Sequence, residues 1–192
     1  NGDARSRLAR LNVNGTLDAT FTNGPNGVVS SIVVQVDGKI VVGGSFSTVG
    51  GIGYGNIVRL NPDGALDTSL ATAFTNGANA GVRSLALQPD GRILVAGAFT
   101  DFGGQPVSRV ARLNMDGTPD LSVTNIANGD VHCVAVQYDD KILVGGDFTT
   151  IRGFTRNRVG RLNPDGSLDL TLTTSATNGV LAVALQPDGK LL

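Results

Sequence analysis

The chain has 192 residues, a formal net charge of −1 and an apolar fraction of 41%. This apolar fraction is sufficient for a folded core and argues against an intrinsically disordered chain. The nearly balanced charge offers no footprint for nucleic acid or an acidic membrane, and no apolar run approaches the ~18 residues of a membrane span. We therefore expect no nucleic-acid partner and no membrane insertion. A single cysteine, Cys133, excludes an intrachain disulfide.

Two short motifs recur along the chain and divide it into repeats. The first motif is a glutamine followed by a turn that contains aspartate and then by a residue that is basic in every copy. It starts at Gln35, Gln88, Gln137 and Gln186, so the copies are 53, 49 and 49 residues apart. The second begins with Arg-Leu-Asn and ends in an aspartate; its arginines are Arg10, Arg59, Arg112 and Arg161. A fixed period indicates one copied supersecondary unit, which buries its apolar faces by stacking on its neighbours.

Each complete repeat is predicted to contain four short antiparallel strands. In the first copy they span residues 29–35, 39–46, 57–61 and 66–70. The turn after the first strand requires a residue with positive φ, and Gly38 adopts that conformation without strain. Asp140 has the equivalent position in the third copy, and aspartate tolerates a positive φ better than most residues. No segment shows convincing helical periodicity, so an all-β fold is expected.

The first strand of each repeat is apolar on both faces. In the first copy one face holds the large Ile32 and Val34, and the other holds the smaller Ser31 and Val33. A strand of this kind must be covered on both sides, and a large face against a small one lets sheets nest. Hydrophobicity falls from the first strand to the fourth, as in sheets that radiate from a buried axis. We therefore predict a β-propeller of four-stranded antiparallel blades.

The whole of 1–192 is predicted to be one repeat-built propeller domain. Its units are an outer half-blade at 1–28, full repeats at 29–81, 82–130 and 131–179, and an inner half-blade at 180–192. We expect the two halves to join as a composite blade of a four-bladed ring, because closure removes an exposed sheet edge. The alternative is a fragment of a larger propeller.

Register within the second hairpin predicts a repeated ion pair. If Asn61 pairs with Ala65 across the turn, Arg59 lies directly opposite Asp67. The other copies repeat the pattern as Arg10 with Asp18, Arg112 with Asp120, and Arg161 with Asp169. Opposite charges across a strand pair contribute ~0.2–1 kcal/mol, so we interpret these pairs as a modest structural lock on the register.

The combined string V-x-S-[I/L]-x-[V/L]-Q-x-D-G-[K/R]-[I/L]-[V/L]-[V/A]-G-x-F, followed by R-L-N-x-D-G-x-L-D, resembles the delta-60 repeat family. The resemblance covers nearly the whole chain and departs from the pattern only at single positions such as Asn14, Pro119 and Asp140. It implies a propeller-like fold in a larger bacterial surface or secreted protein, and hence extracellular placement, neighbouring domains and a binding or scaffolding role. No catalytic residue belongs to the motif.

The third copy gathers positive charge around an aromatic residue. Arg152, Arg156 and Arg158 lie close to Phe154 in the loop between the second and third strands. They are a candidate contact for an anion or an acidic glycan. The competing interpretation is a solvated charged loop, since blocks of like charge are usually solvated.

His132 and Cys133 could suggest a nucleophile with its base, or metal ligands. Neighbouring residues on a strand point to opposite faces, so these two cannot converge, and a structural or surface role is predicted for both. The segment 61–67 superficially resembles a calcium loop, but its glycine comes at the fourth position and no glutamate follows. Turn chemistry explains it, and neither a metal nor a cofactor is expected.

Two further features have a structural interpretation. Phe21 and Phe74 leave the fourth strand at equivalent positions and are predicted to plug between sheets. Glycine pairs such as Gly43-Gly44 and Gly145-Gly146 fall within strands, where they let backbones approach closely.

The resulting hypothesis is a non-catalytic propeller module that binds or displays a protein or glycan. One alternative is a propeller-type hydrolase or lyase, which needs convergent acids; those outside the repeat pattern are Asp101, Asp130 and Asp147. A pure structural spacer is the other alternative.

Overall fold

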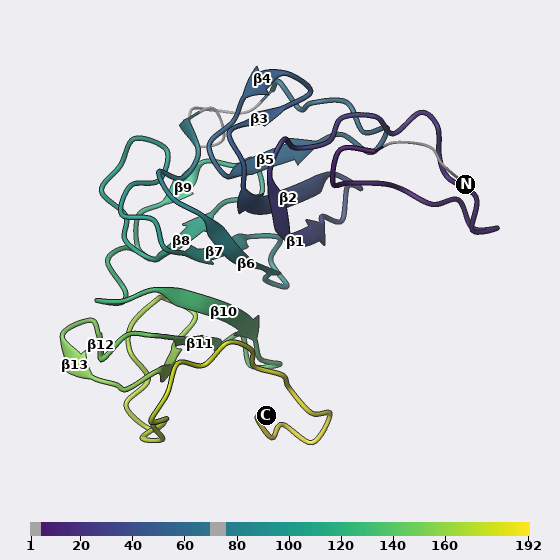
Figure 1. The fold of residues 1–192 in the computed structure, drawn as a ribbon. Coiled ribbons are helices and arrows are strands. Elements are labelled where there is room, and N and C mark those ends of the chain that lie inside the picture. Colours follow the sequence, from purple (N-terminus) through teal and green to yellow (C-terminus); the bar gives the residue numbers. More distant parts are fainter. Residues whose placement is uncertain (1–4, 70–75) are drawn as a thin grey trace.

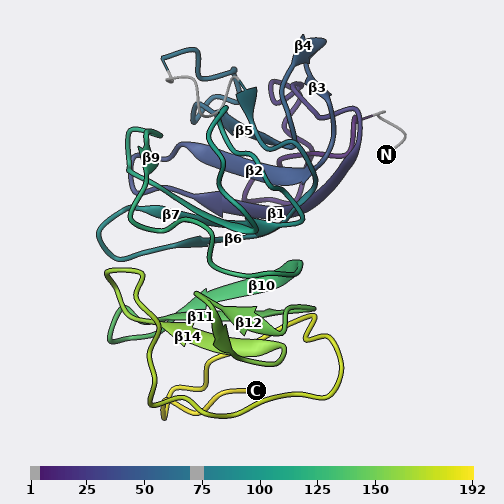
Figure 2. The ribbon, with the colours of Figure 1, turned by 90° about the vertical axis from the view of Figure 1, so that its left-hand side faces the viewer.

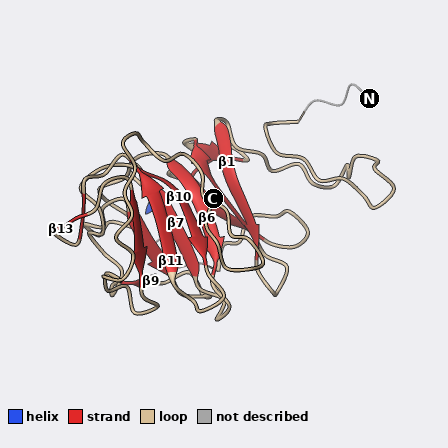
Figure 3. Cartoon of the chain, turned by 90° about the horizontal axis from the view of Figure 1, so that it is seen from below, coloured by secondary structure: helices blue, strands red, loops and turns tan. Residues whose placement is uncertain are grey.

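The computed structural model describes residues 5–69 and 76–192, and strands and loops make up nearly all of them (Figure 3). The first five strands are β1 Val28–Val34, β2 Ile40–Ser45, β3 Thr48–Val49, β4 Ile52–Gly53 and β5 Ile57–Leu60. The next four are β6 Val82–Leu87, β7 Ile93–Gly97, β8 Val110–Leu113 and β9 Pro119–Asp120. The last five are β10 Val131–Val136, β11 Ile142–Gly146, β12 Thr150–Ile151, β13 Phe154–Thr155 and β14 Val159–Leu162.

Three antiparallel sheets repeat one topology. The first has the order β1-β2-β5, the second β6-β7-β8-β9 and the third β10-β11-β14. Their first strands, β1, β6 and β10, lie side by side. Figures 1 and 2 show the first sheet above and the third below, with the second between them. The predicted all-β architecture of radiating antiparallel sheets is confirmed.

The turn that joins the first two strands has the predicted geometry. The amide of Gln35 donates to the carbonyl of Lys39 at 2.8 Å, and the amide of Gly38 donates back to Gln35 at 2.9 Å. Gly38 has a φ of 81° and Asp140 a φ of 62°. The left-handed position is therefore real in both copies, and aspartate tolerates it in the third.

The fourth strand is much shorter than predicted. In the first sheet it is reduced to a single bridge between Leu60 and Leu66, and the end of the predicted strand, residue 70, lies outside the described residues. The carboxylate of Asp67 accepts hydrogen bonds from the amide and hydroxyl of Ser69, which turns the chain away from the sheet. The connection between the second and third predicted strands also contains a small hairpin, formed by β3 and β4.

Neighbouring sheets pack a large face against a small one, as predicted. Leu85 of β6 packs in one core with Val33 and Val41 of the first sheet, and Val134 of β10 packs with Ala86 of β6. A hydroxyl joins the inner strands at each interface. Ser31 Oγ accepts from the amide of Leu85 at 3.0 Å, and Ser84 Oγ accepts from Val134 at 3.2 Å.

The first sheet departs from the prediction that both faces of the inner strand are covered. Ile32 is 46% exposed and Val34 is 57% exposed. The outer part of the same face is covered, because Phe21 packs there with Val42 and Leu60. Its other side has no second sheet among the described residues, so its predicted place between two sheets stays a prediction. The equivalent Phe74 lies outside the described residues.

The composite blade expected from the two ends is not formed in this structure. Among the described residues, the bridges of the terminal segments lie within each segment, at Leu11–Leu17 and Leu185–Leu191. Figure 1 shows the two segments beside different sheets, well apart. In a complete sheet the second strand, such as β2, lies between the first strand and the third. The segment 180–192 corresponds to the first strand and only the beginning of the second, so it cannot pair with the N-terminal segment in this way. The number of blades stays a prediction.

The glycines within strands allow close backbone approach. A Cβ atom on Gly44 would lie 2.0 Å from the carbonyl oxygen of Val28, and one on Gly146 would lie 2.1 Å from that of Asp130. Both glycines oppose the start of an inner strand, next to a register shift in the pairing. No side chain fits there.

Candidate functional site

The four arginine–aspartate pairs predicted from the register are present. In each pair the arginine Nε donates to the aspartate Oδ2 at 2.8 Å. The pair formed by Arg59 and Asp67 is the most enclosed, with side chains 2% and 3% exposed. Lys39 adds a second cation 3.2 Å from the Asp67 carboxylate.

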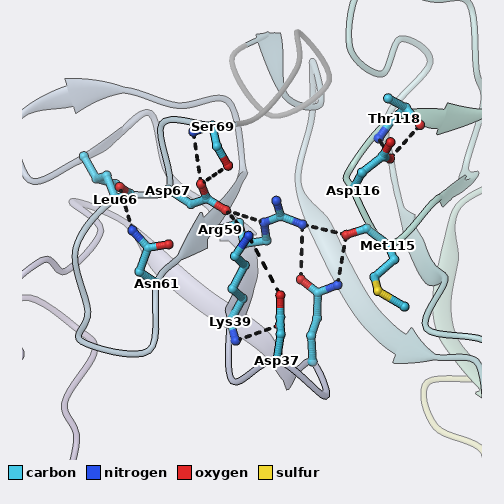
Figure 4. A network of polar contacts seen from close by, with 11 residues as sticks. Asp37, Lys39, Arg59, Asn61, Leu66, Asp67, Ser69, Met115, Asp116 and Thr118 are labelled. Carbon is cyan, nitrogen blue, oxygen red and sulfur yellow. Dashed lines mark hydrogen bonds and ion pairs between the residues drawn. The ribbon is translucent and has the colours of Figure 1, made fainter.

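Three of these arginines also reach the turn of the next repeat, a role that the motif alone did not reveal. Arg59 Nη1 donates to the carbonyl oxygen of Met115 at 2.8 Å, and Gln35 Nε2 donates to the same oxygen at 3.3 Å (Figure 4). The equivalent arginines Arg10 and Arg112 reach the turn carbonyls of Pro62 and Pro164. Each donor therefore holds the following turn in place.

The aspartates of these pairs are strong acids. Burial opposes ionisation of Asp67, but hydrogen bonds from Ser69 and Lys39 and the charge of Arg59 outweigh it and lower its pKa to about 2. Hydrogen bonds from the hydroxyl and amide of Thr20, followed by one from Arg10, lower the pKa of Asp18 to about 2. A carboxylate held by several donors stays ionised, which suits a structural lock rather than a proton carrier.

A pocket of about 450 Å³ lies where the β12–β13 hairpin approaches the last turn of the third sheet. Its lining consists of Ser122, Arg152, Phe154, Asp165, Ser167, Leu168 and Leu170. The structure thus brings two predicted contact residues, Arg152 and Phe154, to one pocket. Phe154 is 53% exposed.

Arg152 is held in a strained conformation at the tip of the hairpin. Its φ is 47°, in the left-handed region, and the equivalent positions in the other copies are glycines, Gly50 and Gly103, with φ of 57° and 65°. Its Nε donates to the carbonyl of Gly166 at 2.7 Å, and its Nη2 donates to that of Ser122 at 2.8 Å. The guanidinium is therefore fixed in place despite its position on a surface turn.

Asp165 supplies the acidic group of the pocket. Its Oδ1 accepts from the amide and the hydroxyl of Ser167, at 2.8 Å and 2.7 Å. These two hydrogen bonds, with a contribution from the charge of Arg152, lower the pKa of Asp165. The pocket thus presents a carboxylate and a guanidinium together.

The other two arginines of the predicted contact do not line this pocket. Arg156 Nη1 donates to the carbonyl of Thr155 at 2.8 Å. Arg158 donates to the carbonyl of Asp147 and has a φ of 69°. Both side chains thus donate to backbone oxygens of the third repeat.

His132 lies in a charged cluster at the start of β10. Its Nδ1 is 2.6 Å from Arg83 Nη1, and its Nε2 is 2.7 Å from Asp147 Oδ2. Because a guanidinium only donates, Nδ1 accepts and Nε2 carries the proton. Arg83 and Arg109 also bind the two oxygens of Asp130, at 2.8 Å and 2.6 Å. The cluster therefore ties the second sheet to the third.

Two of the three acids outside the repeat pattern, Asp130 and Asp147, thus converge, whereas Asp101 lies elsewhere and accepts from the amide of Gly104 at 3.0 Å. Within the described ranges no group of three His, Cys or Asp side chains is arranged to hold a metal ion. Cys133 is buried on the opposite face of β10 from His132, against Gly145. Burial raises the pKa of its thiol.

Sheets that radiate from adjacent inner strands, with arginines joining consecutive turns, define the chain as a β-propeller. It belongs to the family described as "Domain of unknown function (DUF5122) beta-propeller", which matches residues 1–21, 35–70, 88–122 and 137–172. The predicted kinship with a propeller repeat family is confirmed at that level. No curated protein matches the chain.

Two solved structures show the same fold at low identity. One is a protein provisionally named gluconolactonase, with a TM-score of 0.55 and 17% identity over 97% of this chain and 63% of that one. The other is streptogramin B lyase, with a TM-score of 0.56 and 17% identity over 97% of this chain and 54% of that one. The chain therefore spans a little over half the length of these propellers. In the described parts of the chain, no helix is long and apolar enough to cross a membrane.

Proposed function

We propose that this propeller is a non-catalytic recognition module that binds a glycan in the pocket beside Arg152 and Phe154. One observation carries the proposal. Arg152 replaces glycine at a left-handed position, where an L-residue is strained, and its side chain lines the pocket. Glycine adopts this conformation freely at the equivalent Gly50 and Gly103, so the arginine at this turn is particular to the third repeat.

The polar part of the pocket suits hydroxyl groups. A guanidinium donates, a carboxylate accepts, and vicinal sugar hydroxyls can do both. Nε and Nη2 of Arg152 donate to carbonyls, so we assign the contact with a ligand to Nη1. The carboxylate of Asp165 repels anions, so a neutral sugar fits better than the acidic glycan suggested by the arginines alone.

The apolar part of the pocket suits the face of a sugar ring. Phe154 and Leu170 are both exposed large side chains beside the polar pair. Small-ligand sites combine apolar surface with a few well-placed polar groups, and an aromatic ring offers a broad face for C–H groups. Phe154 replaces Gln105 and Ile52 of the other copies, so this face is specific to the third sheet.

A glycan array followed by calorimetric titration of the best hit tests the proposal. Phe154→Ala and Asp165→Asn are each expected to weaken binding by about tenfold or more, equivalent to ~1.4 kcal/mol. The matched controls are Ile52→Ala and Asp116→Asn, which change the equivalent positions of other sheets and should leave the affinity unchanged. An array without hits, or equal losses in test and control variants, would contradict the proposal.

The alternative of a hydrolase or lyase has one observation in its favour, the contact between His132 and Asp147. Both ring nitrogens of His132 are already engaged, by Arg83 and Asp147, so the imidazole has no nitrogen available to take a proton from a substrate. Turnover of an ester, lactone or glycan that is lost in His132→Ala would favour the enzyme.

We further infer that the repeats are of the delta-60 kind and that the module is displayed outside the cell beside other domains. The motif string supports the repeat assignment, and the location and the neighbouring domains are what the resemblance to that repeat family implies. Detection of the native protein on intact cells by an antibody against this module tests the location.

A further inference from the structure

Among the described residues, two apolar faces lack a neighbouring sheet, one on β1 and one on the segment 180–192. On the first sheet, β1 presents the large side chains Ile32 and Val34 to solvent. At the other end, the segment 180–192 presents the small side chains Ala182 and Ala184, both exposed. We propose that these two faces bind each other between two copies of the chain, head to tail.

The interfaces inside the chain show how the contact forms. At both of them the large face of one inner strand covers the small face of the preceding one, and Leu85 and Val134 are 6% and 7% exposed as a result. Ile32 is the equivalent residue of β1, and Ala182 is equivalent to Ser31. The open faces therefore have the side chains that the internal interfaces pair. Uncharged apolar patches on a surface mark interaction sites.

The arginine contacts are incomplete at the same two ends. Arg10, Arg59 and Arg112 each reach a carbonyl of the following turn. Arg161 contacts Gln137 Oε1 at 3.3 Å, as Arg59 contacts Gln35, but among the described residues it reaches no carbonyl of a following turn. Val13, at the equivalent turn position of the first segment, is fully exposed. A head-to-tail contact supplies Arg161 with the carbonyl of Val13 from the next copy.

The arrangement of the chain favours a second copy over closure within one molecule. The segment 180–192 lies beyond the third sheet and the N-terminal segment lies beside the first (Figures 1 and 2). Each is already folded into its own hairpin. Both open faces are thus presented at once, and a heterologous contact of this type produces rings or filaments.

Sedimentation velocity over a range of concentrations tests the proposal. The average mass of the sedimenting species is expected to increase with protein concentration. Ile32→Asp or Ala182→Arg should weaken the association by about tenfold or more, because each places a charge in an apolar contact. Ile52→Asp is the control, since Ile52 is similarly exposed but lies on β4, away from both faces. Thermal unfolding confirms that the variants fold.

Two further variants make the test directional. Ala182→Ser restores the hydroxyl that Ser31 and Ser84 provide at the internal interfaces, and should tighten the association about threefold through one hydrogen bond to the Ile32 amide. A mixture of Ile32→Asp and Ala182→Asp retains one intact face of each kind, and its two altered faces carry like charges that repel, so it should form a heterodimer and no larger species.

An interchain or intrachain contact can also be distinguished covalently. In the double variant Ile32→Cys with Ala182→Cys, oxidation should produce dimers and larger species on a non-reducing gel; Cys133 is buried and should not compete. An intrachain bond in a protein that stays monomeric would overturn the proposal in favour of a closed single chain. A wild-type monomer at all concentrations would also overturn it, as would association unchanged in both charged variants.

Discussion

The guanidinium of Arg59 donates to the carbonyl oxygen of Met115 at 2.8 Å, across 56 residues of chain. The same guanidinium holds Asp67 within its own sheet. One buried cation therefore sets the register of a hairpin and fixes the next sheet against it.

Arg59→Ala is expected to destabilise the domain by ~3–5 kcal/mol, because it leaves the Asp67 carboxylate buried with less compensation. Arg10→Ala removes the equivalent arginine, whose side chain is 34% exposed, and should cost about 1 kcal/mol. Urea unfolding of both variants measures the difference. Equal losses would mean that burial does not set the importance of the pair.

Stability should fall in acid because of the same carboxylate. Asp67 has a pKa of about 2 in the folded chain, against an ordinary value of 3.8. The unfolded chain binds the proton first, so this contribution is complete above pH ~5 and is lost as the pH falls towards 2. Unfolding free energies measured between pH 2 and 6 should show this slope, and Asp67→Asn should make it less steep by the share of one carboxylate, because Asp18 and Asp165 still contribute. An unchanged slope in the variant would assign the acid sensitivity to other groups.

The strain at Arg152 can be separated from its contacts. Arg152→Gly and Arg152→Ala both remove the hydrogen bonds to Gly166 and Ser122, but only glycine accepts a φ of 47° freely. Arg152→Gly should therefore be more stable than Arg152→Ala by ~1–2 kcal/mol. Both should lose glycan binding. Equal stability of the two variants would show that the turn relaxes and that the arginine is unstrained.

The strand glycines provide a test of packing between backbones. Gly146→Ala would place a methyl group 2.1 Å from the Asp130 carbonyl, and the required shift should cost ~1–3 kcal/mol or more. Gly53→Ala meets nothing within 4 Å and should change stability by less than ~0.5 kcal/mol. Thermal unfolding of the two variants compares them directly. A tolerated alanine at Gly146 would show that the inner strand can move aside.

Local features of this fold could be predicted, and contacts between sheets could not. The pairing of Arg59 with Asp67 follows from a hairpin register eight residues apart, and its position was correct. The contact of Arg59 with Met115 has a backbone oxygen as acceptor, which carries no signal in the side-chain sequence. The short fourth strand was missed because the bond from Ser69 to Asp67 competes with strand pairing, and propensity alone does not reveal which wins.

The candidate site was visible in part. Arg152 and Phe154 stood out by charge and aromaticity, and an alignment of the copies places Arg152 opposite Gly50 and Gly103. That substitution of arginine for glycine was the available signal of a strained turn. Asp165 could not be separated by sequence from the other turn aspartates, because only the folded hairpin brings it beside Arg152. The convergence of His132 with Arg83 and Asp147 likewise depends on two sheets meeting.

The hydrogen bonds from arginine to the turn of the next repeat have a peptide oxygen as the acceptor, and every amino acid provides one. Proline occupies this corner twice and methionine once, at Pro62, Pro164 and Met115, yet an arginine reaches all three. After a gene duplication, mutations at the corner leave this hydrogen bond intact as long as the arginine is kept. Copies can therefore diverge in their outward-facing turns while the array still assembles, which opens these turns to the evolution of new specificities.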